Sequence, residues 1–249
     1  MKPHHHKYWL NHFVEDEATF RQEVRNLCKL YHQAAELHEE GVHIVSTDEK
    51  TGIQAIERIH PTRPMRPGQT EAVEFEYERH GTQTLIANFE VATGKVICAS
   101  VGDTRTEKDF AQHIRNTINT DPQGQWVFIC DQLNTHKSET LVKTIAQLCD
   151  LKDELGIKGK SGILKNMTSR ADFLQDETHR IRLVYTPKHC SWLNQVEIWF
   201  SILTRRLLKR GNFSSTEELK QRIFKFIDFF NETLAKPFRW TYIGKPLLI

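Results

Sequence analysis

Apolar residues recur at helical spacing near both ends of the chain. Residues 15–40 place apolar side chains three or four positions apart, which predicts an amphipathic helix that ends before Gly41. Toward the C-terminus the same spacing predicts a helix over residues 192–210. A second helix is predicted there, beginning with a serine–glutamate capping pattern at 214–218 and stopping before Pro237.

Short β-prone runs occupy the middle of the chain and then alternate with helices. The predicted elements are, in order, a strand at 42–48, a proline-rich loop at 61–68, a hairpin of strands at 82–91 and 95–101, a helix at 106–118, a strand at 126–131, a helix at 138–148 and a strand at 182–185. This order predicts an α/β fold, in which an antiparallel three-strand meander is followed by parallel strands reached through helices.

The composition excludes a membrane-spanning protein and a low-complexity chain. Of 249 residues 39% are hydrophobic and 27% are charged, and no run of about 18 uncharged apolar residues occurs. This length suits one large domain, or one domain with appendages. The five cysteines are odd in number and contain no C-x-x-C pair, which favours a reduced, cytoplasmic protein.

The net charge of +2 hides an uneven distribution. Residues 1–60 contain 7 lysines and arginines against 10 acidic residues, whereas residues 187–249 contain 11 against 5. This basic excess is compatible with a polyanionic partner, and equally with a solvated helix face. At the N-terminus, three histidines at 4–6 are either native or the remnant of a tag.

Three acidic residues are candidates for a shared site. Asp48 and Asp131 each close a β-prone run, where a strand would hold a carboxylate at the carboxyl edge of a sheet. Glu197 lies at the border of the apolar stripe of the helix at 192–210, and we expect it to point along the packed face toward the sheet. The alternative for each acid taken alone is a local cap or ion pair.

Carboxylates brought together repel one another and resist ionisation unless cations neutralise them. Ligand sets made only of oxygen favour hard ions such as Mg²⁺ or Mn²⁺. Two such ions about 4 Å apart can clamp the attacking and leaving oxygens of a phosphodiester. The three acids therefore point to a site for one or, more typically, two divalent ions.

Three segments together resemble the DDE-type bacterial insertion-sequence transposases of the Tc/mariner superfamily. They are DQLNTH at 131–136, YTPKHCSWLNQVE at 185–197 and KPFRWTY at 236–242. The resemblance extends over essentially the whole chain. It implies a ribonuclease-H-like fold, a mixed sheet flanked by helices, with Asp48, Asp131 and Glu197 as the catalytic, metal-binding triad.

The chain departs from this family in two ways. A helix-turn-helix region that reads the transposon ends normally precedes the catalytic domain, but here the chain opens at a linker. A frameshift that joins this chain to an upstream helix-turn-helix product would explain the difference. The second and third acids are 66 positions apart, so an insertion is expected at about 151–180. We therefore expect a linker and helix at 1–40 and a catalytic domain at 41–249.

Several polar residues lie close in sequence to the acids or on the basic helix. Asn134 and His136, and likewise Lys188 and His189, are expected either to position phosphate oxygens or to hydrogen-bond their own loops. Four cations face away from the apolar stripe of the helix at 192–210, and they either contact phosphates or are simply solvated: Arg205, Arg206, Lys209 and Arg210. A Gly-Lys-Ser run at 159–161 lacks the preceding strand and first glycine of a phosphate-binding loop.

The resemblance implies metal-dependent phosphodiester hydrolysis at transposon ends, followed by strand transfer into target DNA. The implied partners are double-stranded DNA and a second copy of the chain in an active homodimer, in the bacterial cytoplasm or on the nucleoid. Two alternatives remain at this stage. One is a truncated product that binds DNA or a full-length partner as a regulator without cutting, and the other is a cellular nuclease on the same fold, disfavoured by the motif at 192–197.

Overall fold

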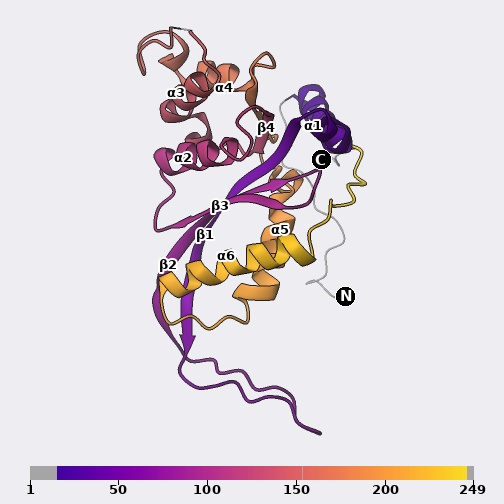
Figure 1. Cartoon of the computed structure of the whole chain (residues 1–249), viewed down its shortest axis with the longest axis vertical. Coiled ribbons are helices and arrows are strands. Elements are labelled where there is room, and N and C mark those ends of the chain that lie inside the picture. The colour runs from indigo at the N-terminus through magenta and orange to yellow at the C-terminus, as the bar shows by residue number, and fades with distance from the viewer. Residues whose placement is uncertain (1–15, 153, 246–249) are drawn as a thin grey trace.

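A five-stranded mixed β-sheet forms the centre of the protein (Figure 1). The computed structural model describes residues 16–152 and 154–245. The strands are β1 (Val42–Arg58), β2 (Tyr77–Glu90), β3 (Val96–Gly102), β4 (Gln125–Cys130) and β5 (Ile181–Tyr185). Strands β1, β2 and β3 pair antiparallel, and β4 and β5 extend the sheet in parallel beside β1, in the order β3-β2-β1-β4-β5. The predicted meander followed by parallel strands is confirmed.

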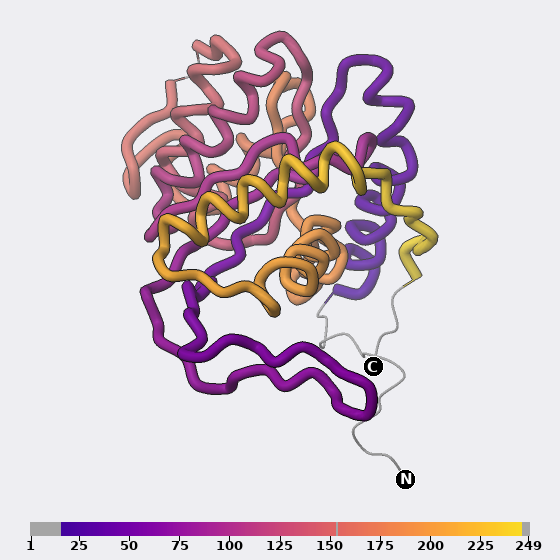
Figure 2. The backbone as a smooth tube through the Cα atoms, turned by 60° about the horizontal axis from the view of Figure 1, so that its bottom comes forward, coloured from indigo at the N-terminus to yellow at the C-terminus, as the bar shows by residue number. Residues whose placement is uncertain are grey.

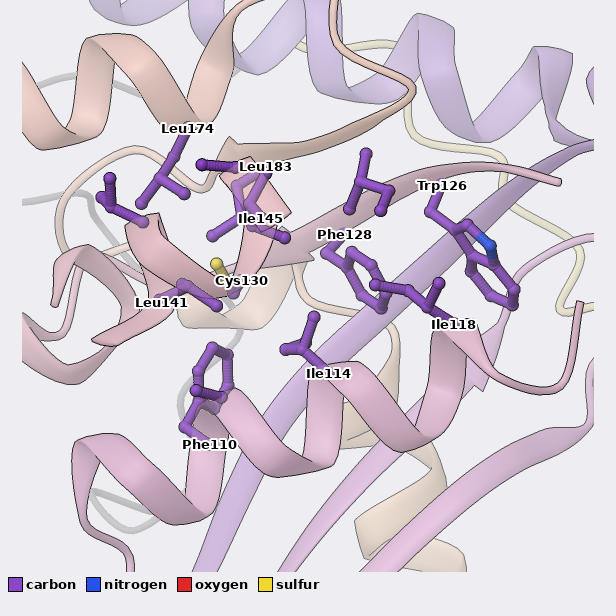
Figure 3. Packing of buried hydrophobic residues seen from close by; sticks show 14 of the residues in the cluster. Phe110, Ile114, Ile118, Trp126, Phe128, Cys130, Leu141, Ile145, Leu174 and Leu183 are labelled. Carbon is purple, nitrogen blue, oxygen red and sulfur yellow. The ribbon is translucent and has the colours of Figure 1, made fainter. Parts of the chain in front are cut away.

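Helices cover both faces of this sheet. They are α1 (Glu17–Glu39), α2 (Glu107–Ile118), α3 (Glu139–Leu148), α4 (Met167–Gln175), α5 (Val196–Leu203) and α6 (Thr216–Thr233). Side chains of α2, α3 and α4 pack with Val45 and Phe128 on one face (Figure 3), and α1 packs with Ile44 on the other, as do α5 and α6 with Phe89. Successive strand residues point to opposite faces, so Ile44 and Val45 contribute to different clusters. None of the helices in the described part of the chain is long and apolar enough to cross a membrane.

Capping side chains mark the starts of three predicted helices, and the cap of α6 falls within the pattern predicted at 214–218. The side chains of Thr106, Ser138 and Ser215 each accept a hydrogen bond from a backbone N–H three residues later, at the starts of α2, α3 and α6. These bonds satisfy N–H groups that the first helical turn leaves without a partner. Helix α6 ends at Thr233, before Pro237, as the sequence predicts.

Strand β1 is longer than the sequence predicts. The strand expected at 42–48 continues to Arg58, because β2 pairs with it from Val45 onward while β4 pairs only with residues 42–46. The expectation that Asp48 ends a strand was therefore wrong. Asp48 lies inside β1, two residues beyond the end of the parallel pairing.

Residues 59–76 form an extended hairpin arm that projects from the body of the protein (Figures 1 and 2). Isolated bridges between Arg63 and Ala72 and between Arg66 and Gln69 hold its two sides together. The proline-rich loop predicted at 61–68 forms one side of this arm. Large apolar side chains are exposed on the arm and at its base, namely Ile59, Met65, Val73, Phe75 and Tyr77. Apolar side chains exposed in one place are typical of an interaction surface.

The helix predicted at 192–210 is interrupted. A 3-10 turn at Ser191–Leu193 precedes α5, and a π-helical turn at Thr204–Leu208 follows it. The interruption before α5 falls at Asn194, whose Nδ2 donates to the Thr47 carbonyl of β1 at 2.9 Å. This bond to the sheet holds Asn194 in an extended conformation, and the prediction of one continuous helix was wrong there.

The segment expected to be an insertion, 151–180, contains a tight turn, a 3-10 turn and α4. In the tight turn Gly156 has φ +80°, and a Cβ there would lie 2.2 Å from the Ser161 carbonyl oxygen. Glycine is required for this close backbone approach. The glycines around the Gly-Lys-Ser run are thus explained by a tight turn.

Candidate active site

Asp48 and Asp131 lie two residues beyond the same point of the pairing between two neighbouring strands. The parallel pairing of β1 with β4 places Ser46 opposite Ile129, and Asp48 follows inside β1 whereas Asp131 follows just after the end of β4. Side chains at matching positions of parallel strands lie next to each other on the sheet. The two aspartates are therefore adjacent at the carboxyl end of this pairing, where ligands of α/β proteins commonly bind.

Asp48 is a buried carboxyl group that no lysine or arginine compensates in the described residues. Its side chain accepts hydrogen bonds from the Glu49 N–H at 2.7 Å and from Asn194 Nδ2 at 3.2 Å. Burial is the main cause that raises the pKa of Asp48, the Glu49 N–H bond opposes it, and the charges of Asp131, Glu197 and Glu49 add to it, which gives a pKa of about 7. The position thus holds more negative charge than its surroundings neutralise.

Asp131 has the opposite electrostatic setting. Burial alone would raise the pKa of Asp131, but a contact from His136 Nδ1 at 2.8 Å and a bond from the Leu133 N–H at 2.9 Å lower it. The positive charges of His136 and Arg105 act in the same direction, and the net pKa is below its usual value. Asp131 is therefore ionised at neutral pH and held in a fixed orientation.

His136 links Asp131 to a second acid, Glu49. Both side chains are buried, and His136 Nε2 lies 3.2 Å from Glu49 Oε1. Burial lowers the pKa of His136, but Cys130, Asp131 and Glu49 outweigh this effect and raise it well above its usual value. The Tyr185 hydroxyl fixes the same turn by donating to the His136 carbonyl at 2.9 Å. His136 acts as a charged clamp between two carboxylates.

Glu197 stands in the first turn of α5 and is exposed. The expectation that it points toward the sheet instead of into water was therefore wrong. Its charge nevertheless contributes to the raised pKa of Asp48, which places it within electrostatic reach of that site. Among the described residues, the carboxylate oxygens of the three acids do not all lie within 4.8 Å of one another. Of the three acids, Glu197 is the exposed one, so its side chain is the least restricted by packing.

Two residues that sequence reasoning did not single out position α5 against β1. The Ser46 hydroxyl donates to Asn194 Oδ1 and accepts from the Val196 N–H at 2.8 Å. Asn194 in turn reaches both the Thr47 carbonyl and Asp48. The signal in the sequence was the polar pair Asn194 and Gln195, which lies between Leu193 and Val196 three positions before Glu197, and Glu49 next to Asp48 was a similar signal.

The other candidate residues lie in the turns that follow β4 and β5 and at the end of the helix that begins with α5. Asn134 is exposed in the 3-10 turn Asn134–Lys137, whereas His136 of the same turn is buried against Phe110. Lys188 and His189 are exposed after β5. The four basic residues predicted to contact DNA are all exposed and line one depression together with Phe226 and Phe229; they are Arg205, Arg206, Lys209 and Arg210.

The sequence profile of the DDE superfamily endonucleases matches residues 43–220, which is more than half of the chain and includes all three acids. The chain belongs to this family. A search among curated proteins finds no match.

Solved structures of Mos1 transposase share the fold of this DDE domain. They include a Mos1 mariner paired-end complex with Mn (TM-score 0.54, 16% identity, 90% of this chain and 59% of that chain), a paired-end complex with left transposon end (0.55, 15%, 95% and 61%), and a strand transfer complex (0.54, 14%, 90% and 58%). At such identities the similarity shows the fold alone, which is the ribonuclease-H-like fold of transposase catalytic domains. The chain spans about 60% of the length of these structures.

The acids of the DDE domain suit hard divalent cations. All three offer carboxylate oxygens, the donors that Mg²⁺ and Mn²⁺ prefer. The pKa of Asp48 is raised to about 7, mainly by burial and further by neighbouring acid charges, and a cation beside Asp48 would favour its ionised form. The donor set and its excess negative charge therefore both fit a metal site.

Proposed function

We propose that this DDE domain is the catalytic domain of a DNA transposase, which hydrolyses phosphodiester bonds at transposon ends and transfers the freed strand into target DNA. Asp48, Asp131 and Glu197 would hold the divalent ions, Mg²⁺ or Mn²⁺. The observation that carries the proposal is a pair of aspartates, one inside β1 and one just after β4, of which the buried Asp48 has a pKa raised to about 7.

Each residue of the site has a distinct task in this proposal. When bound, two divalent ions would stabilise the charge that develops on the attacking and leaving oxygens of the phosphate. Asp48 is fixed by Asn194, and Asp131 is fixed by His136, so both ligands are preorganised. Glu197 is exposed at the start of α5 and would complete the ligand set from the solvent side.

DNA is the substrate that the surrounding charges favour. The segment that begins with Glu197 continues into exposed cations, so a phosphate backbone along this helix would approach the acids at its other end. Lys188 and His189 are exposed on the turn that follows β5, and in this proposal they contact the same strand. The Mos1 structures of the same fold are described as complexes with transposon ends and as a strand transfer complex, which agrees with this substrate.

A second copy of the chain is the protein partner in this proposal. The hairpin arm extends beyond the body and exposes Met65 at 76% and Phe75 at 82% of their full accessibility. Burial of such side chains would stabilise a homodimer, at roughly 25 cal/mol for each Å² removed from water. The molar mass of the DNA complex, measured by light scattering, checks this stoichiometry.

The test is cleavage of a labelled duplex that carries a transposon end, with Mg²⁺ or Mn²⁺ present. Asp131→Asn should abolish nicking and leave DNA binding intact or stronger, because it removes a ligand and a negative charge near phosphate. Asp172→Asn, an exposed aspartate of α4, is the matched control and should cut normally. Binding without cutting by both the wild-type chain and the control would favour the regulator alternative, and cleavage by pure Asp131→Asn would exclude the metal role.

A further inference from the structure

A second group of histidine and carboxylate side chains lies at the other end of β1. It consists of His38 in the last turn of α1, His43 at the start of β1 and Glu90 at the end of β2. Glu90 Oε1 is 2.6 Å from His43 Nδ1 and 3.5 Å from His38 Nδ1. One ligand atom from each residue lies within 4.8 Å of the other two, so the three donors converge.

The side chains around this group hold two of the three donors in place. His43 Nε2 lies 3.1 Å from Asp121 Oδ2, and the His43 ring stacks on Trp126 at 4.1 Å between centroids. The other oxygen of Glu90 accepts a hydrogen bond from the Thr93 hydroxyl at 2.6 Å, and the Glu90 side chain is only 5% exposed. Histidine ligands of metal ions typically contact a carboxylate through their second nitrogen, as His43 does here.

His38 supplies the second observation. Its Nδ1 is shielded from solvent and makes no hydrogen bond in the structure, although it is directed at the carboxylate of Glu90. A shielded polar nitrogen without a partner costs free energy, since it loses its bond to water and gains nothing in return. A cation between His38, His43 and Glu90 would satisfy this nitrogen.

We propose that His38, His43 and Glu90 form a binding site for a borderline-soft divalent cation of the Zn²⁺ class, separate from the catalytic acids. Two imidazole nitrogens and one carboxylate oxygen are a donor set typical of Zn²⁺ and unlike the oxygen-only set around Asp48. Tetrahedral bonds of about 2.0–2.1 Å place neighbouring ligand atoms about 3.3 Å apart. The 3.5 Å between His38 Nδ1 and Glu90 Oε1 already fits this spacing. The 2.6 Å between His43 Nδ1 and Glu90 Oε1 would need to increase by under about 1 Å.

This ion would have a structural task. It would join the end of α1, the start of β1 and the end of β2, and through Asp121 also the loop that precedes β4. The side chain of His38 is 35% exposed, so water has access to a fourth coordination position. The site shares no residue with the proposed catalytic set, and its existence does not depend on DNA cleavage.

The experiment measures Zn²⁺ binding by the full chain, with Co²⁺ as a spectroscopic probe. The histidines at 4–6 are replaced by alanine, because they are chelators in their own right, and excess Mg²⁺ occupies the catalytic acids. We expect one tightly bound Zn²⁺ per chain, a rise in melting temperature on its addition, and a tetrahedral visible spectrum with Co²⁺. Replacing His38 by Gln or Glu90 by Gln should weaken binding at least about 10-fold, and Asp121→Asn about 10- to 100-fold.

Two matched controls make the result specific. His32→Gln changes an exposed histidine of the same helix, and His80→Gln changes the other His–Glu cluster, Glu57–Glu78–His80. Both should bind Zn²⁺ like the parent chain. His38→Gln is the decisive variant because His38 is partly exposed and its replacement leaves the core intact. Absence of stoichiometric binding, or binding unchanged in His38→Gln, would overturn the proposal and leave a proton-bridged cluster only.

Discussion

The two ends of the short parallel pairing between β1 and β4 carry different chemistry. At the carboxyl end the charges of Asp131 and Glu197 act on Asp48, and the candidate donors are oxygens. At the amino end His43 contacts Glu90 and Asp121, and imidazole nitrogens predominate. The five residue pairs between β1 and β4 therefore separate a group of acids at one end of these strands from a group that contains histidines at the other end.

The difference lies in how many histidine side chains face the carboxylates at each end. At the amino end two histidines face Glu90, and His43 also faces Asp121. At the carboxyl end one buried histidine, His136, serves both Glu49 and Asp131, and Asp48 is left with a pKa of about 7. The proposed hard cation therefore lies at the Asp48 end, where the donors are carboxylate oxygens, and the proposed Zn²⁺ site lies at the His43 end, where imidazole nitrogens join Glu90.

The largest expected effect is on the rate of DNA cleavage, which should depend on the acids at the Asp48 end and not on the histidines at the His43 end. Glu197→Gln should lower the rate of Mg²⁺-dependent cleavage at least about 100-fold, because ligand loss removes several kcal/mol of transition-state stabilisation. His38→Gln should leave that rate within about twofold. Glu217→Gln, an exposed glutamate in the first turn of α6, is the control for Glu197. Single-turnover cleavage rates measure all three, and an equal loss in His38→Gln would contradict the separation.

A stability prediction concerns the His136 clamp. His136→Phe should lower the free energy of unfolding by about 3 kcal/mol at neutral pH, because it leaves the buried carboxylate of Glu49 without its partner. His80→Phe removes the same kind of contact, His80 Nε2 to Glu57 at 2.8 Å, at a site where both side chains are partly exposed. That variant should lose less than about 1 kcal/mol. Urea unfolding measures both, and equal losses would show that burial is not the cause.

The raised pKa of Asp48 predicts a pH dependence of stability without metal. The folded protein retains a proton on Asp48 up to about pH 7, whereas the unfolded chain releases it near pH 3.8, so Asp48 lowers stability as the pH rises through this range. Asp48→Asn removes this effect. The free energy of unfolding of Asp48→Asn minus that of wild type should therefore be about 2–3 kcal/mol larger at pH 8 than at pH 5, since one pKa unit corresponds to about 1.4 kcal/mol.

Urea unfolding in EDTA at both pH values measures this difference. Addition of Mg²⁺ should reduce the gap by stabilising the wild-type carboxylate. Asp172→Asn, which changes an exposed aspartate, should show no such dependence. A constant difference between Asp48→Asn and wild type across this pH range would show that Asp48 is ionised throughout.

The smallest effect concerns DNA binding beside the Asp48 end. Each phosphate neutralised contributes about −0.9 to the slope of log affinity against log salt. Replacing Arg206 and Lys209 with alanine should therefore flatten this slope by about 2 without changing which sequences bind. Replacing Lys108 and Lys143, exposed on α2 and α3, should leave it unchanged. Tight, salt-insensitive binding to one sequence would show that this chain reads DNA bases.

The local elements of this protein were predictable because their causes are local. Helix caps such as Thr106 and Ser138 act within three residues, and the turn between β2 and β3 is specified by residues next to one another. Asp131 became a candidate because a β-prone run ends immediately before it, and β4 does end at Cys130. Glu197 became a candidate through its motif and its place on the apolar stripe, but its exposure was not predicted, because helical spacing does not report how a helix start is held.

The sequence by itself determined the order of the five strands, most of the helices and the choice of three candidate acids, since these depend on spacing and on short motifs. Only the tertiary structure decided that β1 continues past Asp48, and that Glu49 meets His136 across 87 positions and Asp48 meets Asn194 across 146. It also decided the meeting of His38, His43 and Glu90. The physical reason is that these contacts follow from strand register and helix docking, which bring together residues whose separation along the chain carries no signal of their approach.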